Sequence, residues 1–280
     1  MKTDVQVAVI GGGIVGASVL YWLSRLGWTD SMLIERRELT SGSTWHAAGN
    51  TTYFGPFAEM TQLFAGSIRT YLQAEQDSGQ SVSFHQTGSL RVATTPRELE
   101  LFHQYKEKYK TLDIPYHVID NAQIAQLHPC IDTNGLFGAA HTPTDGHVDP
   151  VGATNALAAS ARAKGASVVR NTPVSLLRAQ DDGWIIETES GDIRAQHVVV
   201  ATSFWTRELL QPLGINTPLY ATEHHEMITG SIAELEALDH EVPAIRDSYA
   251  STNIRQEGTG FLAGIWKSSL IVFLRSEKWV

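Results

Sequence analysis

Residues 5–16 read VQVAVIGGGIVG, an apolar run that leads into three consecutive glycines. The β-branched apolar run that ends at the glycines is typical of a parallel strand covered on both faces. Apolar residues then recur at helical spacing, at Val15, Val19, Leu23 and Leu26, and Gly27 is a plausible stop. A second apolar run at 32–34 ends in Glu35. Together these segments predict a β-α-β unit.

The glycines match the Gly-x-Gly-x-x-Gly pattern of a dinucleotide-binding loop. We expect Gly11 to permit the tight turn, Gly13 to let the backbone approach a pyrophosphate, and Gly16 to allow close packing of helix on strand. The N-terminus of the helix adds partial positive charge. Glu35 lies near the offset of about 20 residues expected for an acid that binds a ribose hydroxyl, and it would repel a 2′-phosphate. The motif therefore argues against NADP but does not separate FAD from NAD.

Composition narrows the class of protein. The chain has 280 residues, 42% of them apolar and 18% charged, which is enough to bury a core and excludes a disordered or collagen-like chain. The formal net charge of -9 is unfavourable for binding nucleic acid. Cys130 is the single cysteine, so no internal disulfide is possible. No targeting signal or membrane-spanning stretch is seen, and we expect a soluble, cytoplasmic protein that binds neither nucleic acid nor membrane.

Further elements are expected from patterning and turn residues. Helices are expected at 96–110, 122–127, 150–164 and 205–210, and strands at 116–119, 167–170, 174–178, 184–188, 198–201 and 219–229. No metal site is expected, because none of the 11 histidines shows a helical i, i+4 pair with a carboxylate and the adjacent His224 and His225 are wrongly spaced for one ion. A hydrolase is disfavoured because no serine lies in a Gly-x-Ser-x-Gly elbow.

A second run of small and hydroxyl residues follows the ribose acid. Residues 36–49 read RRELTSGSTWHAAG and include Trp45 and His46. A nicotinamide site has no obvious use for such a loop, whereas the larger ring system of a flavin must pass backbone that comes very close. We therefore expect FAD, with Arg36, Ser43 and Thr44 among the residues that contact it.

Residues 39–49 closely resemble the dimethylglycine dehydrogenase and sarcosine dehydrogenase family of FAD-dependent amine oxidoreductases. The resemblance continues at 51–54, 84–95, 145–150 and 204–208, and it covers about residues 5–264. It implies that His46 is attached covalently to the flavin ring, that the backbone of Val174 meets the adenine, and that His224 lies in the active site. The turn after the strand at 198–201 usually ends in glycine in this fold, and here it reads Ala-Thr-Ser, which puts a close backbone approach there in doubt.

The resemblance implies an α/β fold with a glutathione-reductase-like FAD-binding Rossmann domain and a mixed β-sheet substrate domain. The expected boundaries are 1–80 and 145–210 for the FAD-binding domain, 81–144 and 211–264 for the substrate domain, and 265–280 for a divergent tail. The implied reaction is oxidation of a small N-methylated amino acid, of the dimethylglycine or sarcosine type, by hydride transfer to the flavin. In an extended strand His224 and His225 point to opposite faces, so only one of them can face the flavin.

Two departures from the family pattern limit what the resemblance implies. Asn253 stands where the family usually has a tyrosine, with Tyr249 nearby. Family members also continue well beyond Gly264, and many carry a C-terminal folate-binding domain, so we expect a truncated N-terminal portion. The alternatives are a non-catalytic remnant, another amino-acid oxidase or dehydrogenase of the same superfamily, and, less favoured, an NAD-dependent dehydrogenase. The electron acceptor and the oligomeric state are not fixed by the sequence.

Overall fold

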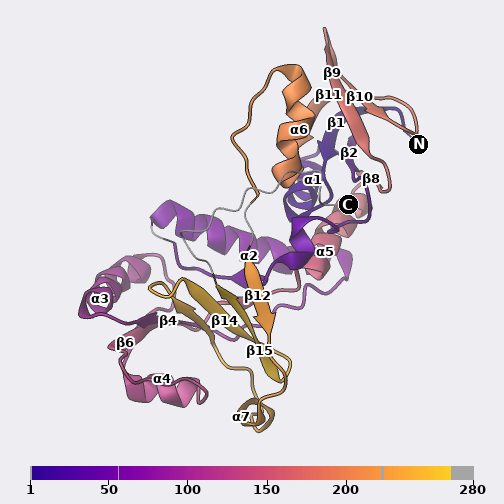
Figure 1. Ribbon diagram of the computed structural model, residues 1–280. Helices are drawn as coiled ribbons and strands as arrows, with labels where there is room; N and C mark the ends of the chain where they lie inside the picture. The colour runs from indigo at the N-terminus through magenta and orange to yellow at the C-terminus, as the bar shows by residue number, and fades with distance from the viewer. Residues whose placement is uncertain (1, 56, 222–223, 266–280) are drawn as a thin grey trace.

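The computed structural model describes residues 2–55, 57–221 and 224–265, and its two larger sheets lie one above the other (Figure 1). Residues 266–280, which make up most of the expected tail and include the apolar run LIVFL at 270–274, lie outside the described residues. Within them, no helix is both long enough and apolar enough to cross a membrane.

The first sheet has six strands in the order β8-β2-β1-β11-β10-β9. Its strands are β1 (Asp4–Ile10), β2 (Ser31–Ile34), β8 (Ser167–Val169), β9 (Val174–Gln180), β10 (Gly183–Thr188) and β11 (Ile193–Val200). The four neighbours β8, β2, β1 and β11 pair in parallel. The remaining two strands, β10 and β9, are antiparallel to their neighbours. The predicted β-α-β unit is confirmed, because α1 (Ile14–Arg25) joins β1 to its parallel neighbour β2.

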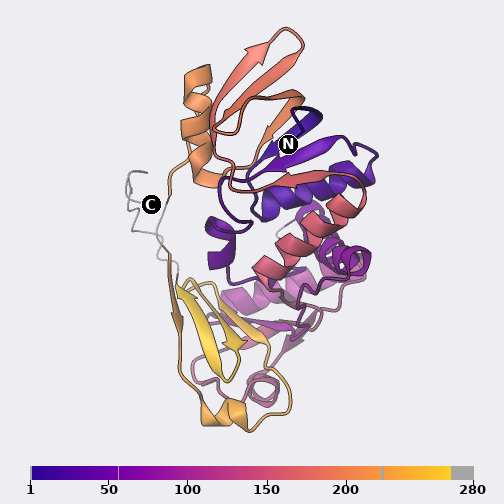
Figure 2. The same ribbon diagram turned by 90° about the vertical axis from the view of Figure 1, so that its right-hand side faces the viewer.

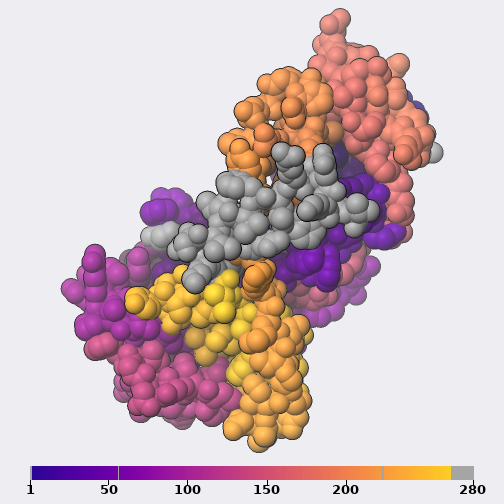
Figure 3. Space-filling model, in the orientation of Figure 1, coloured from indigo at the N-terminus to yellow at the C-terminus, as the bar shows by residue number. Residues whose placement is uncertain are grey.

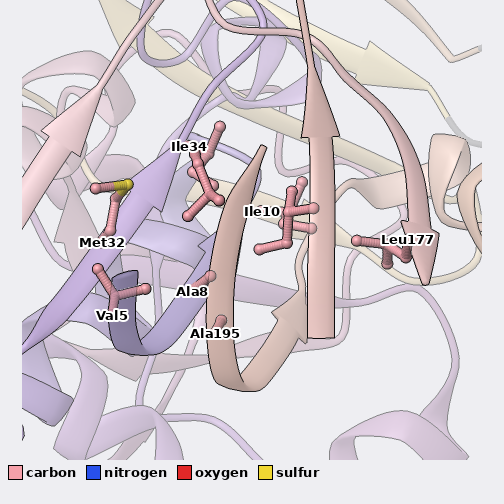
Figure 4. Packing of buried hydrophobic residues seen from close by; sticks show 9 residues of the cluster. Val5, Ala8, Ile10, Met32, Ile34, Leu177 and Ala195 are labelled. Carbon is pink, nitrogen blue, oxygen red and sulfur yellow. The ribbon is translucent and has the colours of Figure 1, made fainter. Parts of the chain in front are cut away.

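Helices cover both faces of this sheet. On one face α1 packs against α5 (Pro150–Ala163), which in turn packs against α2 (Ala58–Ser78). On the other face, Val5, Ile10, Met32, Ile34 and Leu177 belong to one buried cluster (Figure 4). Leucines of α6 (Thr206–Leu210) and the adjacent turn η3 (Gln211–Leu213) pack against this cluster. Burial on both faces explains why β1 and β2 are mostly apolar.

The second sheet has seven strands in the order β12-β15-β14-β13-β4-β6-β5. Its strands are β4 (Ser89–Ala93), β5 (His117–Ile119), β6 (Gly138–Thr142), β12 (His225–Ile228), β13 (Ala244–Asp247), β14 (Thr252–Glu257) and β15 (Gly260–Ile265). The helices α3 (Pro96–Thr111), α4 (Asn121–Leu127) and α7 (Ala233–Glu236) belong to this half. Figure 2 shows this half below the first sheet, and in Figure 3 the same half, coloured from magenta to yellow, forms the lower part of the visible face.

A two-stranded ribbon lies between the halves. Its strands are β3 (Asn50–Thr51) and β7 (Gly146–His147), which pair antiparallel. The first sheet takes its strands from 4–34 and 167–200, and the second takes them from 89–142 and 225–265. The exact domain boundaries stay a prediction.

One helix of the structure was not expected, and two expected elements differ in extent. The 21-residue helix α2 was not expected, because the residues that it buries include Thr61, Ala65 and Ala74, whose small or polar side chains leave little apolar periodicity to detect. The run at 219–229 forms a strand only over β12, and residues 222–223 lie outside the described part. The helix expected at 205–210 begins with a separate 3-10 turn, η2 (Ser203–Trp205).

Candidate active site

The glycine loop after β1 leaves no space for side chains. Gly11 has φ +111°, and a Cβ added to it would lie 2.4 Å from the carbonyl oxygen of Ala201. A Cβ on Gly16 would lie 1.9 Å from the carbonyl oxygen of Gly11. One on Gly13 would lie 2.8 Å from Thr44 Oγ1. The backbone at the start of α1 is therefore bare, as a loop that receives a pyrophosphate requires.

Glu35 lies at the end of β2, beside this loop. Its side chain is almost fully buried, and Oε2 accepts a hydrogen bond of 2.6 Å from the backbone N–H of Gly12. Oε1 accepts another of 2.9 Å from the N–H of Arg37. A carboxylate oxygen has two lone pairs, so each can accept a further hydroxyl. The position fits the predicted ribose-binding acid.

The second loop packs directly on the glycine loop. Thr44 Oγ1 accepts a hydrogen bond of 3.0 Å from the N–H of Ile14, the first residue of α1. The N-cap residue Gly13 makes no side-chain cap of its own, so Thr44 supplies one from a distant part of the sequence. The N–H of Thr40 also donates to the carbonyl of Gly12 at 3.0 Å. Thr44 therefore positions the loop and the start of α1 relative to each other.

The same loop contacts the turn that follows β11. The guanidinium of Arg36 lies 4.0 Å from the ring centroid of Trp205, and Ser43 Oγ lies 3.3 Å from Ser203 Oγ. The N–H of Ala201 donates to the carbonyl of Ile10 at 2.8 Å. Gly11 provides the space for the carbonyl of Ala201, and the approach of this turn to the flavin stays a prediction.

His46 is the last residue of the 3-10 turn η1 (Ser43–His46), and its side chain is exposed. Its ring lies against that of Trp45, with 3.8 Å between the centroids. Val174 is half-buried at the start of β9 and packs on the cluster of Figure 4. Two residues earlier, the N–H of Thr172 donates to the carbonyl of Glu35 at 2.9 Å. The predicted cofactor residues therefore lie around the same end of the first sheet.

One face of the second sheet is polar. The strand registers place Arg91, Arg246, Asn253, Gly264 and Glu226 in one row across neighbouring strands. Directly registered residues lie on the same face of a sheet. The opposite face carries the buried residues Leu90 and Ile245 and the half-buried Ile254, which pack with Ile124 of α4.

The polar face is turned toward the second loop. Arg255 follows Asn253 by two residues in β14, and its Nε donates a hydrogen bond of 2.7 Å to the carbonyl of Ala48, two residues after His46. Residues two apart in a strand share a face. The polar row that contains Arg91 and Arg246 therefore faces the loop that carries His46.

His224 immediately precedes β12, the edge strand at one end of the second sheet, and it is exposed. Alternation along the strand places it on the side of Glu226, which belongs to the polar face, whereas His225 is registered with Ile265 on the other side. The alternation therefore favours His224 over His225. His224 comes from a different sheet from the cofactor residues.

A buried charge cluster had no role assigned from the sequence. Asp145 is 1% exposed and accepts hydrogen bonds from Ser89 Oγ at 2.6 Å, Thr52 Oγ1 at 2.8 Å and the N–H of Tyr53 at 2.7 Å. Burial raises the pKa of Asp145. Burial, with the nearby charge of Arg246, lowers the pKa of Arg91 to about 10. The only local signal was that residues 84–95 and 145–150 match the family, which says nothing of their pairing.

The comparisons with known proteins agree with this geometry. A family model described as FAD dependent oxidoreductase matches residues 6–265. The chain belongs to the FAD-dependent oxidoreductase family. The cofactor of this family is FAD, and the bare loop, the buried Glu35 and the start of α1 fit it.

Two curated relatives show which members of this family the chain is similar to. The chain is 40% identical to human mitochondrial dimethylglycine dehydrogenase over 95% of its own length and 31% of that protein. It is 34% identical to a formaldehyde-forming 4-methylaminobutanoate oxidase of Paenarthrobacter nicotinovorans, over 95% of the chain and 32% of the relative. The chain therefore spans about a third of the length of these curated relatives.

Solved structures share the fold. The structure of L-proline dehydrogenase from P. horikoshii superposes with a TM-score of 0.84 at 26% identity, covering 95% of this chain and 71% of that one. L-amino acid deaminase from Proteus vulgaris has a TM-score of 0.78 at 19% identity, covering 95% and 61%, and shows the fold alone. The predicted fold class is confirmed.

Proposed function

We propose that this chain forms the cofactor-binding and substrate-facing parts of an amine oxidoreductase that oxidises a small N-methylated amino acid. The relatives named for dimethylglycine, sarcosine and 4-methylaminobutanoate support this substrate class, because each named compound joins an N-methylated nitrogen to a carboxylate. The observation that carries the proposal is that the polar row, with Arg91 and Arg246, faces the loop of His46. A substrate bound there would have its carboxylate at these two arginines and its amine toward that loop.

The charges of the polar face favour an anion. Arg91 and Arg246 are registered side by side, and a single buried carboxylate, Asp145, lies near both of them. A positive charge in excess within a partly buried region favours a ligand carboxylate, and guanidinium groups bind carboxylates in a bidentate geometry. We assign Arg91 and Arg246 to the carboxylate end of the substrate.

The residues of the first sheet would hold the cofactor. Gly11, Gly13 and Gly16, with the start of α1, would receive the pyrophosphate, and Glu35 the ribose hydroxyl. Arg36, Ser43 and Val174 line the same end, and His46 would form the covalent bond to the ring system. FAD, when bound, supplies the two-electron oxidant for the carbon–nitrogen bond of the amine.

His224 would act on the substrate nitrogen. An amine carries a proton at neutral pH, and its lone pair must be free before the adjacent carbon–hydrogen bond is oxidised. A ring nitrogen of His224 would accept that proton as a general base. The exposed edge position of β12 leaves the ring within reach of solvent, to which the proton can pass.

The first test is acid precipitation of the purified chain. We expect flavin absorbance in the pellet of the wild type, and none in the pellet of His46→Ala, because a covalent bond survives denaturation. His103→Ala is the matched control, since His103 is exposed on α3 and far from the loop in sequence. Flavin that leaves the wild-type pellet and stays in solution would contradict covalent attachment while leaving FAD binding intact.

A second test addresses the substrate class. In Arg246→Leu we expect the affinity for dimethylglycine, read from the perturbed flavin spectrum, to fall on the order of 10- to 100-fold, since a hydrogen bond between charged groups is lost. Trimethylamine, which lacks the carboxylate, should bind both proteins equally. Arg178→Leu, at a largely exposed position in β9, is the control. An equal loss for both amines would contradict a carboxylate role.

A regulatory role without turnover is the second candidate function. The chain is 31% identical to a mouse protein named pyruvate dehydrogenase phosphatase regulatory subunit, over 94% of the chain and 30% of that protein. Asn253, in the middle of the polar row, stands where the resembling dehydrogenases have a tyrosine. Purified protein that binds FAD but shows no spectral response to any N-methylated amino acid would favour this role.

A further inference from the structure

Two histidine side chains and one glutamate side chain lie close together beside the two-stranded ribbon. His85 precedes β4, His147 belongs to β7, and Glu241 precedes β13. The N–H of His85 donates to the carbonyl of His147 at 2.9 Å, and the N–H of His147 donates back at 3.0 Å. Such a reciprocal pair puts both side chains on one side of the ladder. The two rings are accordingly stacked, with 4.8 Å between the centroids.

The backbone fixes this arrangement firmly. A Cβ added to Gly146 would lie 2.1 Å from the carbonyl oxygen of His85, so the two segments could not approach as they do with any other residue there. Asn50 of β3 is registered with His147 from the other side. His147 is therefore held between two neighbouring strands.

Glu241 completes the group. Its Oε1 lies 2.9 Å from His85 Nδ1, and its Oε2 lies 3.6 Å from His147 Nε2. One ligand atom from each of the three residues lies within 4.8 Å of the others. All three donors therefore converge on one small volume.

An independent observation shows that the polar atoms are incompletely satisfied. His147 is 8% exposed, and its Nε2 is buried without a hydrogen-bond partner. Glu241 Oε2, which faces it, is also buried without a partner. A buried polar atom left in this state costs about 1–3 kcal/mol. Two such atoms that face each other indicate a missing ligand between them.

We propose that His85, His147 and Glu241 bind a divalent transition-metal ion, with Zn²⁺ as the best match to the donors. Two imidazoles and one carboxylate form a common zinc ligand set. Donors around a tetrahedral zinc lie about 3.3–3.6 Å apart, given bonds of about 2.0–2.2 Å. The His85 side chain is 46% exposed, so its ring can move inward, and the open side leaves room for water as the fourth ligand.

The surrounding charges permit a cation. The positive charge of Arg255 would repel a cation, but its Nη1 lies 2.6 Å from Glu257 Oε2. Glu241 and Glu257 together therefore outweigh one guanidinium before the ion binds.

The position indicates what the ion does. β7 pairs with β3, which directly follows the loop of His46, whereas Glu241 lies just before β13 of the second sheet. An ion here would join the segment that follows the loop of His46 to the second sheet. No spacing along the sequence indicates the site, because its ligands lie at positions 85, 147 and 241.

The site is tested on the full chain after dialysis against a chelator. We expect Co²⁺ to bind with a one-to-one stoichiometry and to give the visible absorption of a tetrahedral site, and Zn²⁺ to displace it and raise the melting temperature. Glu241→Gln and His85→Gln alter partly exposed side chains and should fold. We expect each to lower the Zn²⁺ affinity at least about tenfold, the smallest loss seen when even an outer partner of a metal ligand is removed.

The control separates this site from chance binding to histidine. The double variant His117→Gln with His141→Gln removes another histidine pair, whose ring centroids are 6.2 Å apart, and should leave the Zn²⁺ affinity unchanged. Equal affinity in the wild type, Glu241→Gln and His85→Gln would overturn the proposal, as would the absence of any stoichiometric binding. The readout needs neither flavin nor amine, so its failure is distinct from failure of the proposed function.

Discussion

The two sheets build their parts of the site in different ways. In the first, the cofactor loop, the helix start and the ribose acid come from one stretch, β1-α1-β2, and the next loop folds directly back on it. In the second, the polar row takes one residue from each of β4, β13, β14, β15 and β12, which are scattered over 89–265. The first half of the site is local in sequence, and the second exists only once the strands have paired.

This difference sets how each half responds to substitution. The cofactor loop depends on van der Waals contacts between backbone atoms, which leave no space, so a single methyl group is enough to disrupt it. The polar row depends on register and on side-chain chemistry, so a change there alters binding or rate while the fold remains. Three substitutions test the contrast.

The largest effect is expected at Gly16. In Gly16→Ala the new methyl carbon would lie 1.9 Å from the carbonyl oxygen of Gly11, so α1 cannot keep its place against the loop. We expect complete loss of flavin from the purified protein and a less stable fold, measured by absorbance and circular dichroism. Gly66→Ala, in the middle of α2 with open space around it, should retain the flavin. Normal flavin content in Gly16→Ala would contradict the packing described here.

An intermediate effect is expected at the histidine pair of the second sheet. His224→Asn should slow amine-dependent bleaching of the flavin on the order of 10²-fold, the low end for loss of a general base. The loss should shrink at high pH, where the amine deprotonates unaided. His225→Asn, on the opposite face, should change the rate little. A slower rate in His225→Asn than in His224→Asn would reverse the assignment of faces.

The smallest effect is expected at Thr44. Thr44→Val keeps the shape of the side chain but removes the oxygen that caps α1, which should lower the free energy of unfolding by about 1 kcal/mol, measured in urea. Thr70→Val is matched to it, because the Thr70 hydroxyl donates only to the Gly66 carbonyl of its own helix. We expect the control to be near neutral. Equal stability of the two variants would mean that the cap contributes nothing.

Much of the first half could be predicted because its chemistry is carried by neighbouring residues. The β-α-β unit, the fold class and the FAD family followed from the glycine loop and from the motif around His46. The charge cluster of Asp145, Arg91 and Arg246 could not be predicted in the same way, since strand pairing brings its members together. The helix α2 escaped notice because its buried positions include small and hydroxyl side chains.

The pairing of β1 has a consequence for biosynthesis. β1 lies between β2 and β11, and Val5 is registered with Ala195. On the ribosome, the strand that carries the cofactor loop is made before both of its neighbours, and β11 begins only at Ile193. Pairings this distant in sequence are slow to form and leave apolar strands exposed meanwhile. The nascent chain should therefore depend on chaperones until β11 is complete.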